Sequence, residues 1–227
     1  MLVQRGESLW THEAPLRFLG FEIGRIMSVV RLSSGGLFVQ SPSQLSDALA
    51  AELDALGDVR FVVPTSKLHG HLHMEAYASR YPDAELFAAP GLELRRRDLT
   101  FDHLLGDVPD PRWAADIDQT AMLGNWWLTE FAFVHHPSRT AILGDFGYYI
   151  GQNSPLKTRL MARMLGVYRQ VGCTTDYRLA IRNVDAFRRS LETVLGWDFD
   201  RVIPGHGEII ESGGKDALIA GYDWLLT

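Results

Sequence analysis

The chain has 227 residues, of which 46% are hydrophobic and 22% are charged, the proportions of an ordinary globular protein with a buried core. Its 22 basic and 28 acidic residues give a net charge of −6, which excludes the basic surface that nucleic-acid binding requires. The single cysteine, Cys173, excludes a disulfide framework and a zinc site built from thiolates.

Targeting and membrane signals are missing from the sequence. Residues 1–7 lack the apolar core of a signal peptide. No apolar run approaches the ~18 residues that a membrane helix needs. We therefore expect a cytoplasmic protein with no membrane partner. The length suits one large α/β domain, so we interpret residues 1–227 as a single domain.

Strand-like and helix-like patterns alternate in the first half of the chain. Residues 27–40 predict a hairpin around a Ser-Ser-Gly-Gly turn. Leucines recur at steps of three and four over residues 42–57, which indicates a helix. A strand at 60–63, a helix at 74–80 and a strand at 85–89 follow. This alternation is typical of an α/β layer fold.

The second half begins with residues 91–124, where Gly106 and two prolines favour loops with short helical pieces. Residues 128–136 and 140–143 then predict two strands joined by a Pro-Ser-Arg turn. Two helices and a last strand are expected after them, at 155–170, 184–195 and 201–203. A short apolar pattern predicts a C-terminal helix.

Three histidines alternate shortly after the predicted strand at 60–63: His69, His71 and His73. Alternate residues of an extended segment point to the same side, so these imidazoles can converge on one point. Neutral imidazole is the commonest metal-ligating side chain and suits Zn, Cu, Fe or Ni. The segment therefore predicts part of a metal site.

Further candidate ligands end or follow other predicted strands: His135, Asp145 and His206. Loops at the ends of strands are where such folds place functional residues. A catalytic zinc ion takes His and carboxylate ligands and keeps one position open for water. Asp145 could bridge two ions or orient that water, so we regard it as the candidate catalytic residue.

In their order along the chain, these features resemble the metallo-β-lactamase superfamily. The resemblance is carried by the early hairpin, the strand before the histidines and three short segments: Tyr81-Pro82-Asp83-Ala84, Gly144-Asp145 and Val202-Ile203-Pro204-Gly205-His206-Gly207. Residues 130–140 and 197–204 make the chain look like an uncharacterised short branch of that superfamily. The resemblance implies a four-layer αββα sandwich, an α/β fold with two inner sheets and helices on both outer faces. It also implies one or two zinc ions, sometimes iron or manganese, at one edge.

The superfamily signature, His-x-His-x-Asp-His, is incomplete in this chain. If His69 and His71 take the first two positions, a histidine and a methionine stand where the aspartate and the last histidine belong. If His71 and His73 take them, the replacements are Glu75 and Ala76. Neither alignment gives the complete ligand set.

By resemblance, the ligands of a first ion would be His69, His71 and His135. Those of a second ion would be Asp145 and His206, with His73 or Glu75. Because the second set lacks the signature aspartate, we expect one zinc ion rather than two, with iron or manganese as alternatives.

This ligand set predicts a metal-dependent hydrolase that acts on a small ester, thioester or lactone through a metal-activated water. The expected partner is a small-molecule substrate. The incomplete signature leaves a second hypothesis open, a non-catalytic protein of the same fold that binds a ligand or a partner. A redox protein is a third hypothesis, which the loss of the signature aspartate disfavours.

Overall fold

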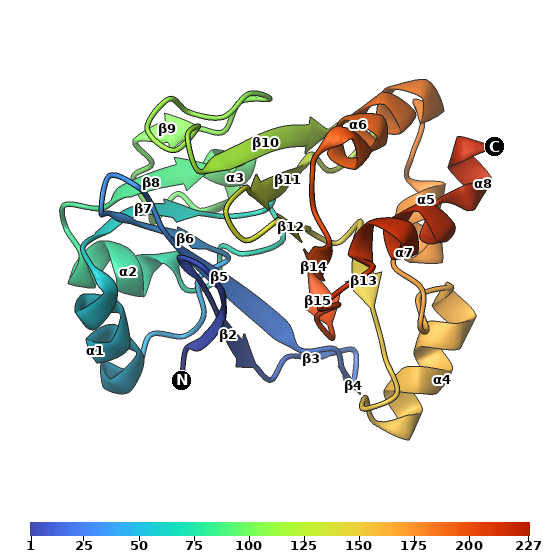
Figure 1. The fold of residues 1–227 in the computed structure, drawn as a ribbon, viewed down its shortest axis with the longest axis horizontal. Helices are drawn as coiled ribbons and strands as arrows, with labels where there is room; N and C mark the ends of the chain where they lie inside the picture. Colours follow the sequence, from blue (N-terminus) through green and yellow to red (C-terminus); the bar gives the residue numbers. More distant parts are fainter.

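Two β-sheets lie face to face in the computed structural model, which describes all 227 residues (Figure 1). The large sheet has the strand order β1-β2-β5-β6-β7-β8-β9. Its strands are β1 (Val3–Gly6), β2 (Leu9–Ala14), β5 (Arg25–Arg31), β6 (Leu37–Gln40), β7 (Val59–Val63), β8 (Glu85–Ala88) and β9 (His103–Leu104). The small sheet has the order β10-β11-β12-β14. Its strands are β10 (Ile117–Met122), β11 (Glu130–His135), β12 (Thr140–Ile142) and β14 (Arg201–Ile203).

Four short strands lie outside these sheets and form two pairs. They are β3 (Arg17–Phe18) with β4 (Phe21–Glu22), and β13 (Tyr148–Tyr149) with β15 (His206–Gly207). The helices are α1 (Asp47–Leu56), α2 (Met74–Arg80), α3 (Leu92–Arg95), α4 (Leu156–Leu165), α5 (Thr175–Leu179), α6 (Val184–Gly196), α7 (Gly214–Gly221) and α8 (Asp223–Leu226). None of them is both long and apolar enough to cross a lipid bilayer.

Alternating side chains of β11 show how the layers are built. Phe131 and Phe133 belong to the cluster between the two sheets, while Ala132 and Val134 pack with residues of α6, α7 and α8. Successive residues of a strand point to opposite faces, so one strand contributes to two cores. A third cluster joins the outer face of the large sheet to α1, α2 and α3. The predicted αββα sandwich is therefore confirmed (Figure 1).

The first predicted helix is shorter than expected and begins where its cap lies. α1 starts at Asp47 rather than at residue 42, and the Ser46 side chain accepts a hydrogen bond from the Leu49 backbone N–H. Such a cap satisfies one of the backbone donors that a helix leaves free at its start. Leu49 and Leu53 then turn their buried side chains toward the large sheet.

The prediction of loops with short helical pieces for residues 91–124 was wrong over its last part. Residues 117–122 form β10, an edge strand that pairs antiparallel with β11 over six residues. The sequence of this strand does not alternate between apolar and polar residues, because its buried polar side chains are satisfied by partners in the preceding loop. Gln119 donates to the Gly106 carbonyl and accepts from the Trp113 indole, and Thr120 donates to Asp107.

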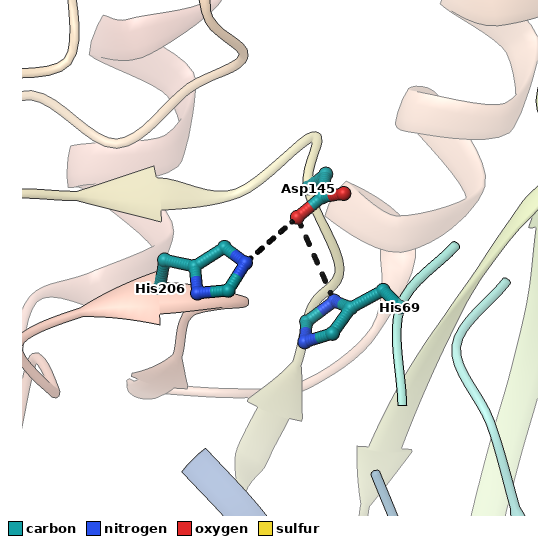
Figure 2. A group of neighbouring side chains, drawn as sticks. All are labelled: His69, Asp145 and His206. Atoms are coloured by element: carbon teal, nitrogen blue, oxygen red, sulfur yellow. Dashed lines mark ion pairs between the residues drawn. The ribbon is translucent and has the colours of Figure 1, made fainter. Parts of the chain in front are cut away.

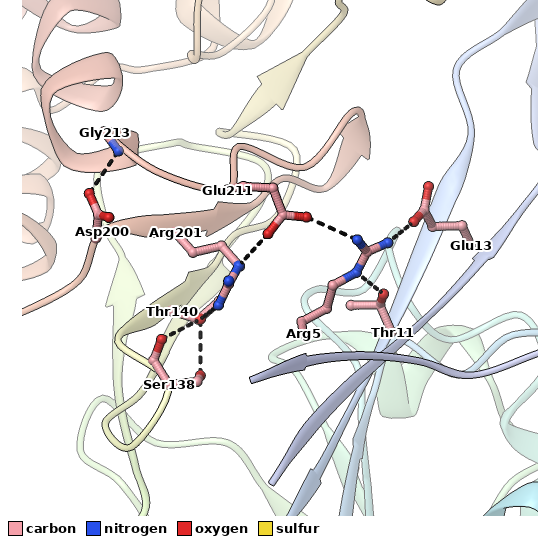
Figure 3. A network of polar contacts seen from close by, with 9 residues as sticks. All are labelled: Arg5, Thr11, Glu13, Ser138, Thr140, Asp200, Arg201, Glu211 and Gly213. Carbon is pink, nitrogen blue, oxygen red and sulfur yellow. Dashed lines mark hydrogen bonds and ion pairs between the residues drawn. The ribbon is translucent and has the colours of Figure 1, made fainter. Parts of the chain in front are cut away.

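A polar network joins one edge of the large sheet to the small sheet (Figure 3). Glu211 accepts hydrogen bonds from Arg5 of β1 and from Arg201 of β14. Arg201 also donates to Thr140 of β12. Close packing accompanies these contacts, since a Cβ at Gly6 would lie 2.8 Å from the Ser138 Cβ. A glycine is required there for β1 to approach the turn that follows β11.

Trp113 is the centre of the cluster between the sheets. Its ring lies 5.1 Å from that of Phe38, 5.2 Å from Phe61 and 4.9 Å from Phe87, centroid to centroid. The side chain is completely buried. Each edge-on aromatic pair adds roughly 0.5–1.5 kcal/mol to the stability from burial.

Replacing this residue tests the packing. We expect Trp113→Ala to lower the free energy of unfolding by about 3–5 kcal/mol, because a large cavity opens between the sheets. The control is Trp126→Ala, whose side chain is 67% exposed, with an expected change within about 0.5 kcal/mol. Urea unfolding followed by circular dichroism measures both, and equal losses would contradict the assignment of the core.

Candidate metal centre

Three of the predicted ligands converge at one end of the sandwich (Figure 2). They are His69, which follows β7; Asp145, which follows β12; and His206, which follows β14 and opens β15. One ligand atom from each lies within 4.8 Å of the other two. The centre therefore combines one residue that follows a strand of the large sheet with two that follow strands of the small sheet.

The two distances from the Asp145 carboxylate to the imidazoles are close to those between ligands of a shared ion. The Asp145 Oδ1 atom lies 3.2 Å from His206 Nε2 and 3.6 Å from His69 Nδ1. With metal–ligand bonds of about 2.0–2.2 Å, two ligand atoms on a tetrahedral zinc ion lie about 3.3 Å apart. The two imidazole rings are stacked, with centroids 4.8 Å apart and planes 18° from parallel.

The backbone fixes which nitrogen of His206 faces the centre. The His206 Nδ1 atom lies 2.6 Å from the Gly24 carbonyl oxygen. Since a carbonyl oxygen only accepts hydrogen bonds, Nδ1 carries the proton and the neutral ring presents its lone pair at Nε2. Metal-binding histidines are commonly oriented by such a hydrogen bond from the nitrogen that does not bind the ion.

The imidazole of His69 is also neutral. Burial lowers the pKa of His69 to about 4, although the negative charge of Asp145 acts in the opposite direction. The positive charge of Arg25, at the start of β5, lowers this pKa further. His69 is therefore neutral at physiological pH, which is the state that binds a metal ion.

Two of the three ligand atoms at the centre have no hydrogen-bond partner in the protein. Both His69 Nδ1 and Asp145 Oδ1 are buried without a hydrogen bond. Each unsatisfied buried polar atom costs about 1–3 kcal/mol. A proton on His206 would provide a partner for the carboxylate alone, whereas a cation between the three atoms would satisfy all of them. The three residues thus fit a metal ion.

The segment between β7 and α2 is folded on itself rather than extended. The Ser66 hydroxyl accepts hydrogen bonds from the backbone of Leu68 and His69, and the His69 carbonyl accepts from Thr65 and Ser66. Gly70 has a positive φ of 84°. Because the histidines do not lie on an extended strand, their alternation does not bring all three together.

His71 and His73 lie outside the group of three. The His71 carbonyl accepts a hydrogen bond from Arg96, and burial lowers the pKa of its imidazole to about 4. His73 occupies the position before α2, and its side chain makes no capping hydrogen bond. Glu75, the alternative to His73, is an exposed residue in the first turn of α2. Of the signature segment, His69 alone thus lies in the group of three.

His135 is far from the centre, and its assignment to the same ligand set as His69 is corrected by the structure. Glu130, at the start of β11, contacts the Asp145 backbone, whereas His135 ends this strand. Five steps of about 3.3 Å place the two ends of the strand roughly 16 Å apart. His135 instead forms a hydrogen bond of 2.7 Å with Ser138.

Glu130 supports the Asp145 loop, a role that the sequence analysis missed. Its carboxylate accepts hydrogen bonds from the backbone N–H groups of Asp145, at 3.0 Å, and Phe146, at 2.9 Å. Burial, and then the charge of Asp145, raise the pKa of Glu130 well above its usual value. The available signal was an acid in the otherwise apolar strand sequence Glu-Phe-Ala-Phe-Val.

Gly144 is needed for this arrangement. A Cβ atom there would lie 2.5 Å from Thr65 Cγ2 and 2.7 Å from a carboxylate oxygen of Glu130. These neighbours leave no space for a side chain beside Asp145. The predicted close approach at the Gly-Asp pair therefore has a structural basis.

Residues 6–170 match the family described as a domain of unknown function, DUF4336. The chain belongs to this family. No curated protein matches the sequence. Among solved structures, the chain is similar to the metallo-β-lactamase DIM-1, with 16% identity over 100% of this chain and 96% of that chain, at a TM-score of 0.66.

Two further structures show the same likeness. A metallo-β-lactamase from Pontibacter korlensis is 11% identical over 100% of this chain and 99% of that chain, with a TM-score of 0.66. The Flv1 flavodiiron core from Synechocystis is 10% identical over 100% of this chain and 60% of that chain, with a TM-score of 0.68. The DUF4336 chain therefore has the metallo-β-lactamase fold, as the sequence motifs predicted.

The buried histidine at the far end of β11 gives a pH-dependent prediction. Burial lowers the pKa of His135 from 6.5 to about 4 in the folded chain. Between these values the unfolded chain binds a proton that the folded chain does not, so stability falls as the pH decreases. The free energy of unfolding should therefore decrease between pH 7 and pH 4, and we expect His135→Asn to make this decrease smaller by up to about 3 kcal/mol. Urea unfolding across this range measures the effect, and an unchanged pH dependence would contradict it.

Proposed function

We propose that this DUF4336 protein is a metal-dependent hydrolase with one metal ion held by His69, Asp145 and His206. The observation that carries the proposal is the convergence of three buried donor atoms, two of which have no partner in the protein. Catalytic zinc sites use three protein ligands and leave a further position for water. Two imidazoles and one carboxylate form such a set, so zinc is the proposed ion, with iron or manganese as alternatives.

A bound ion would act as a Lewis acid, polarising a substrate carbonyl and lowering the pKa of water to about 7. The residues of the chain hold this centre in place beforehand. Gly24 orients His206, and Glu130 holds the loop that carries Asp145. Figure 2 shows the second carboxylate oxygen of Asp145 pointing away from both imidazoles. We propose that this oxygen accepts a proton from the attacking water.

The proposed substrate is a small ester, thioester or lactone. This class follows from the chemistry, because a single ion with an open position suits attack of water on a carbonyl. The likeness to flavodiiron proteins supports the fold alone, and a redox centre with two irons would need more carboxylates than this group provides. The net charge of −6 also disfavours nucleic acid as a substrate.

A specific observation favours a second candidate function, a non-catalytic protein of the same fold. The signature aspartate and last histidine are replaced, and both His71 and His135 lie outside the group. In such a protein a proton on His206 would pair with Asp145, whose oxygen lies 3.2 Å away. The protein would then bind a ligand or partner without a metal ion.

Metal content separates the two candidates. We expect about one zinc ion per chain in protein incubated with zinc and then desalted, measured by elemental analysis. Asp145→Asn and His206→Ala should each weaken zinc binding by at least about 100-fold, because each removes a ligand. His136→Ala is the control, since this histidine is exposed next to His135 and far from the centre. A chain that binds no zinc, iron or manganese would exclude the hydrolase and favour the second candidate.

Activity is the second test. We expect zinc-loaded protein to hydrolyse p-nitrophenyl acetate, with a decrease in kcat/KM of at least about 100-fold in Asp145→Asn after correction for bound zinc. His136→Ala should retain the activity of the unaltered chain. Equal activity in Asp145→Asn at full zinc occupancy would contradict the role of this carboxylate.

A further inference from the structure

An apolar pocket lies between the β3–β4 hairpin and α4, elements that are neighbours in Figure 1. Its volume is about 320 Å³, near the lower end of the usual range for small-molecule sites. Eight of its ten lining residues are hydrophobic, and they include Phe18, Phe21, Ile23, Met161 and Leu165. Pockets of this kind bind the apolar part of a small molecule, because burying hydrocarbon surface is favourable.

The pocket adjoins the candidate metal centre through Tyr148. The Tyr148 side chain lines the pocket, and its ring centroid lies 4.8 Å from that of His206. The two residues are also paired in register between β13 and β15. One wall of the pocket is thus in contact with a proposed metal ligand.

A second wall shares its backbone with the centre. Ile23 lines the pocket, and its carbonyl accepts a hydrogen bond from the Gly207 backbone. The next residue, Gly24, accepts the hydrogen bond that orients His206. The pocket and the centre are therefore built on the same short segments.

The charge of the lining restricts the ligand. Apart from Tyr148 with its hydroxyl group, the polar residues in the lining are Thr174 and Asp176, and no lysine or arginine is among them. Lys157 lies outside the lining, with its Nζ atom 5.0 Å from the centroid of the Phe21 ring, whereas Asp176 lines the pocket and would repel phosphorylated or carboxylated ligands. The ligand should be neutral and apolar where it enters.

The hairpin leaves apolar side chains exposed beside the pocket. Phe18 is 60% exposed and Leu19 is 81% exposed. Leu19 also has a positive φ of 48°, an uncommon conformation for a leucine. A hydrocarbon chain in the pocket would cover part of this surface, whereas a volume of about 320 Å³ is too small for a folded segment of another protein.

We propose that this pocket binds the apolar acyl group of an uncharged ester or thioester, with the carbonyl directed past Tyr148 toward the metal centre. The substrate class rests on the proposed hydrolase function, whereas the binding of an apolar chain does not. Tyr148 is a positioning residue in this arrangement, since its ring lines the pocket and lies against that of His206. The specificity of the protein would then be for medium-length acyl chains.

Binding is tested first, without any dependence on catalysis. The probe is 1-octanol, titrated into the full chain with and without zinc, while methyl resonances of labelled methionines are recorded. We expect the Met161 methyl group to shift and saturate, and that of Met164, which is 84% exposed on the same helix, to stay unchanged. No shift at Met161 would overturn the pocket proposal.

Matched substitutions provide the second measurement. Met161→Trp should fill the pocket and weaken octanol binding at least tenfold by calorimetry, whereas Met164→Trp should bind as the unaltered chain does. A thermal unfolding curve shows whether each variant is folded. Equal octanol binding by a folded Met161→Trp would overturn the proposal. It would also be overturned if two copies of the chain associate through the β3–β4 hairpin and thereby leave the pocket closed to octanol.

A chain-length series then tests the substrate class. With p-nitrophenyl acetate, butyrate, hexanoate and octanoate, kcat/KM should rise about three- to fourfold for each methylene that enters the pocket. The series should become flat in Met161→Trp and persist in Met164→Trp. Octanol binding without hydrolysis of any ester would exclude the proposed function and leave the pocket supported. Hydrolysis with a flat series and no octanol binding would exclude the pocket alone.

Discussion

The arrangement of this site depends on one carboxylate oxygen that is buried between two imidazoles. Asp145 Oδ1 has no hydrogen-bond donor in the protein. His206 Nε2 faces it with the lone pair of the neutral ring, and His69 Nδ1 faces it from a ring that burial keeps neutral. The carboxylate oxygen lies 3.2 Å from one nitrogen and 3.6 Å from the other, and facing lone pairs at such distances repel unless a proton or a metal ion lies between them. The surrounding structure maintains this arrangement through Gly24 and through Glu130, whose carboxylate binds the backbone of the Asp145 loop.

Much of the fold follows from the sequence because its strands bury both faces. The apolar runs at 59–63 and 130–135 and the leucine spacing of α1 carry strong patterns, and these elements lie where they were expected. β10 was missed since its polar residues are satisfied by side chains and carbonyls of a loop that no local pattern reveals. The role of Glu130 was missed for the same reason, because its hydrogen-bond partner is the backbone N–H of Asp145, 15 residues further along the chain.

The sequence identified candidate residues of the site by their positions after predicted strands. Asp145 and His206 follow strands of one parallel pair, β12 and β14, so the same edge of the sheet presents both of them. The prediction for His135 was wrong because β11 runs antiparallel to β12. The last residue of β11 therefore lies at the opposite end of the strands from Asp145 and His206. Strand direction, which alternation along the sequence does not reveal, therefore decides which histidines converge.

The origin of the three residues in different sheets has a mechanical consequence. His69 leaves the large sheet, whereas Asp145 and His206 leave the small one, so an ion held by all three would cross-link the two halves of the sandwich. The affinity for the ion and the resistance of the halves to separation would then be thermodynamically linked, since an ion that binds only the assembled site stabilises the folded state in proportion to its binding. Sliding of one sheet against the other would change the spacing of the three residues. If the centre holds an ion, the packing of the aromatic rings around Trp113 would therefore influence the metal affinity from a distance.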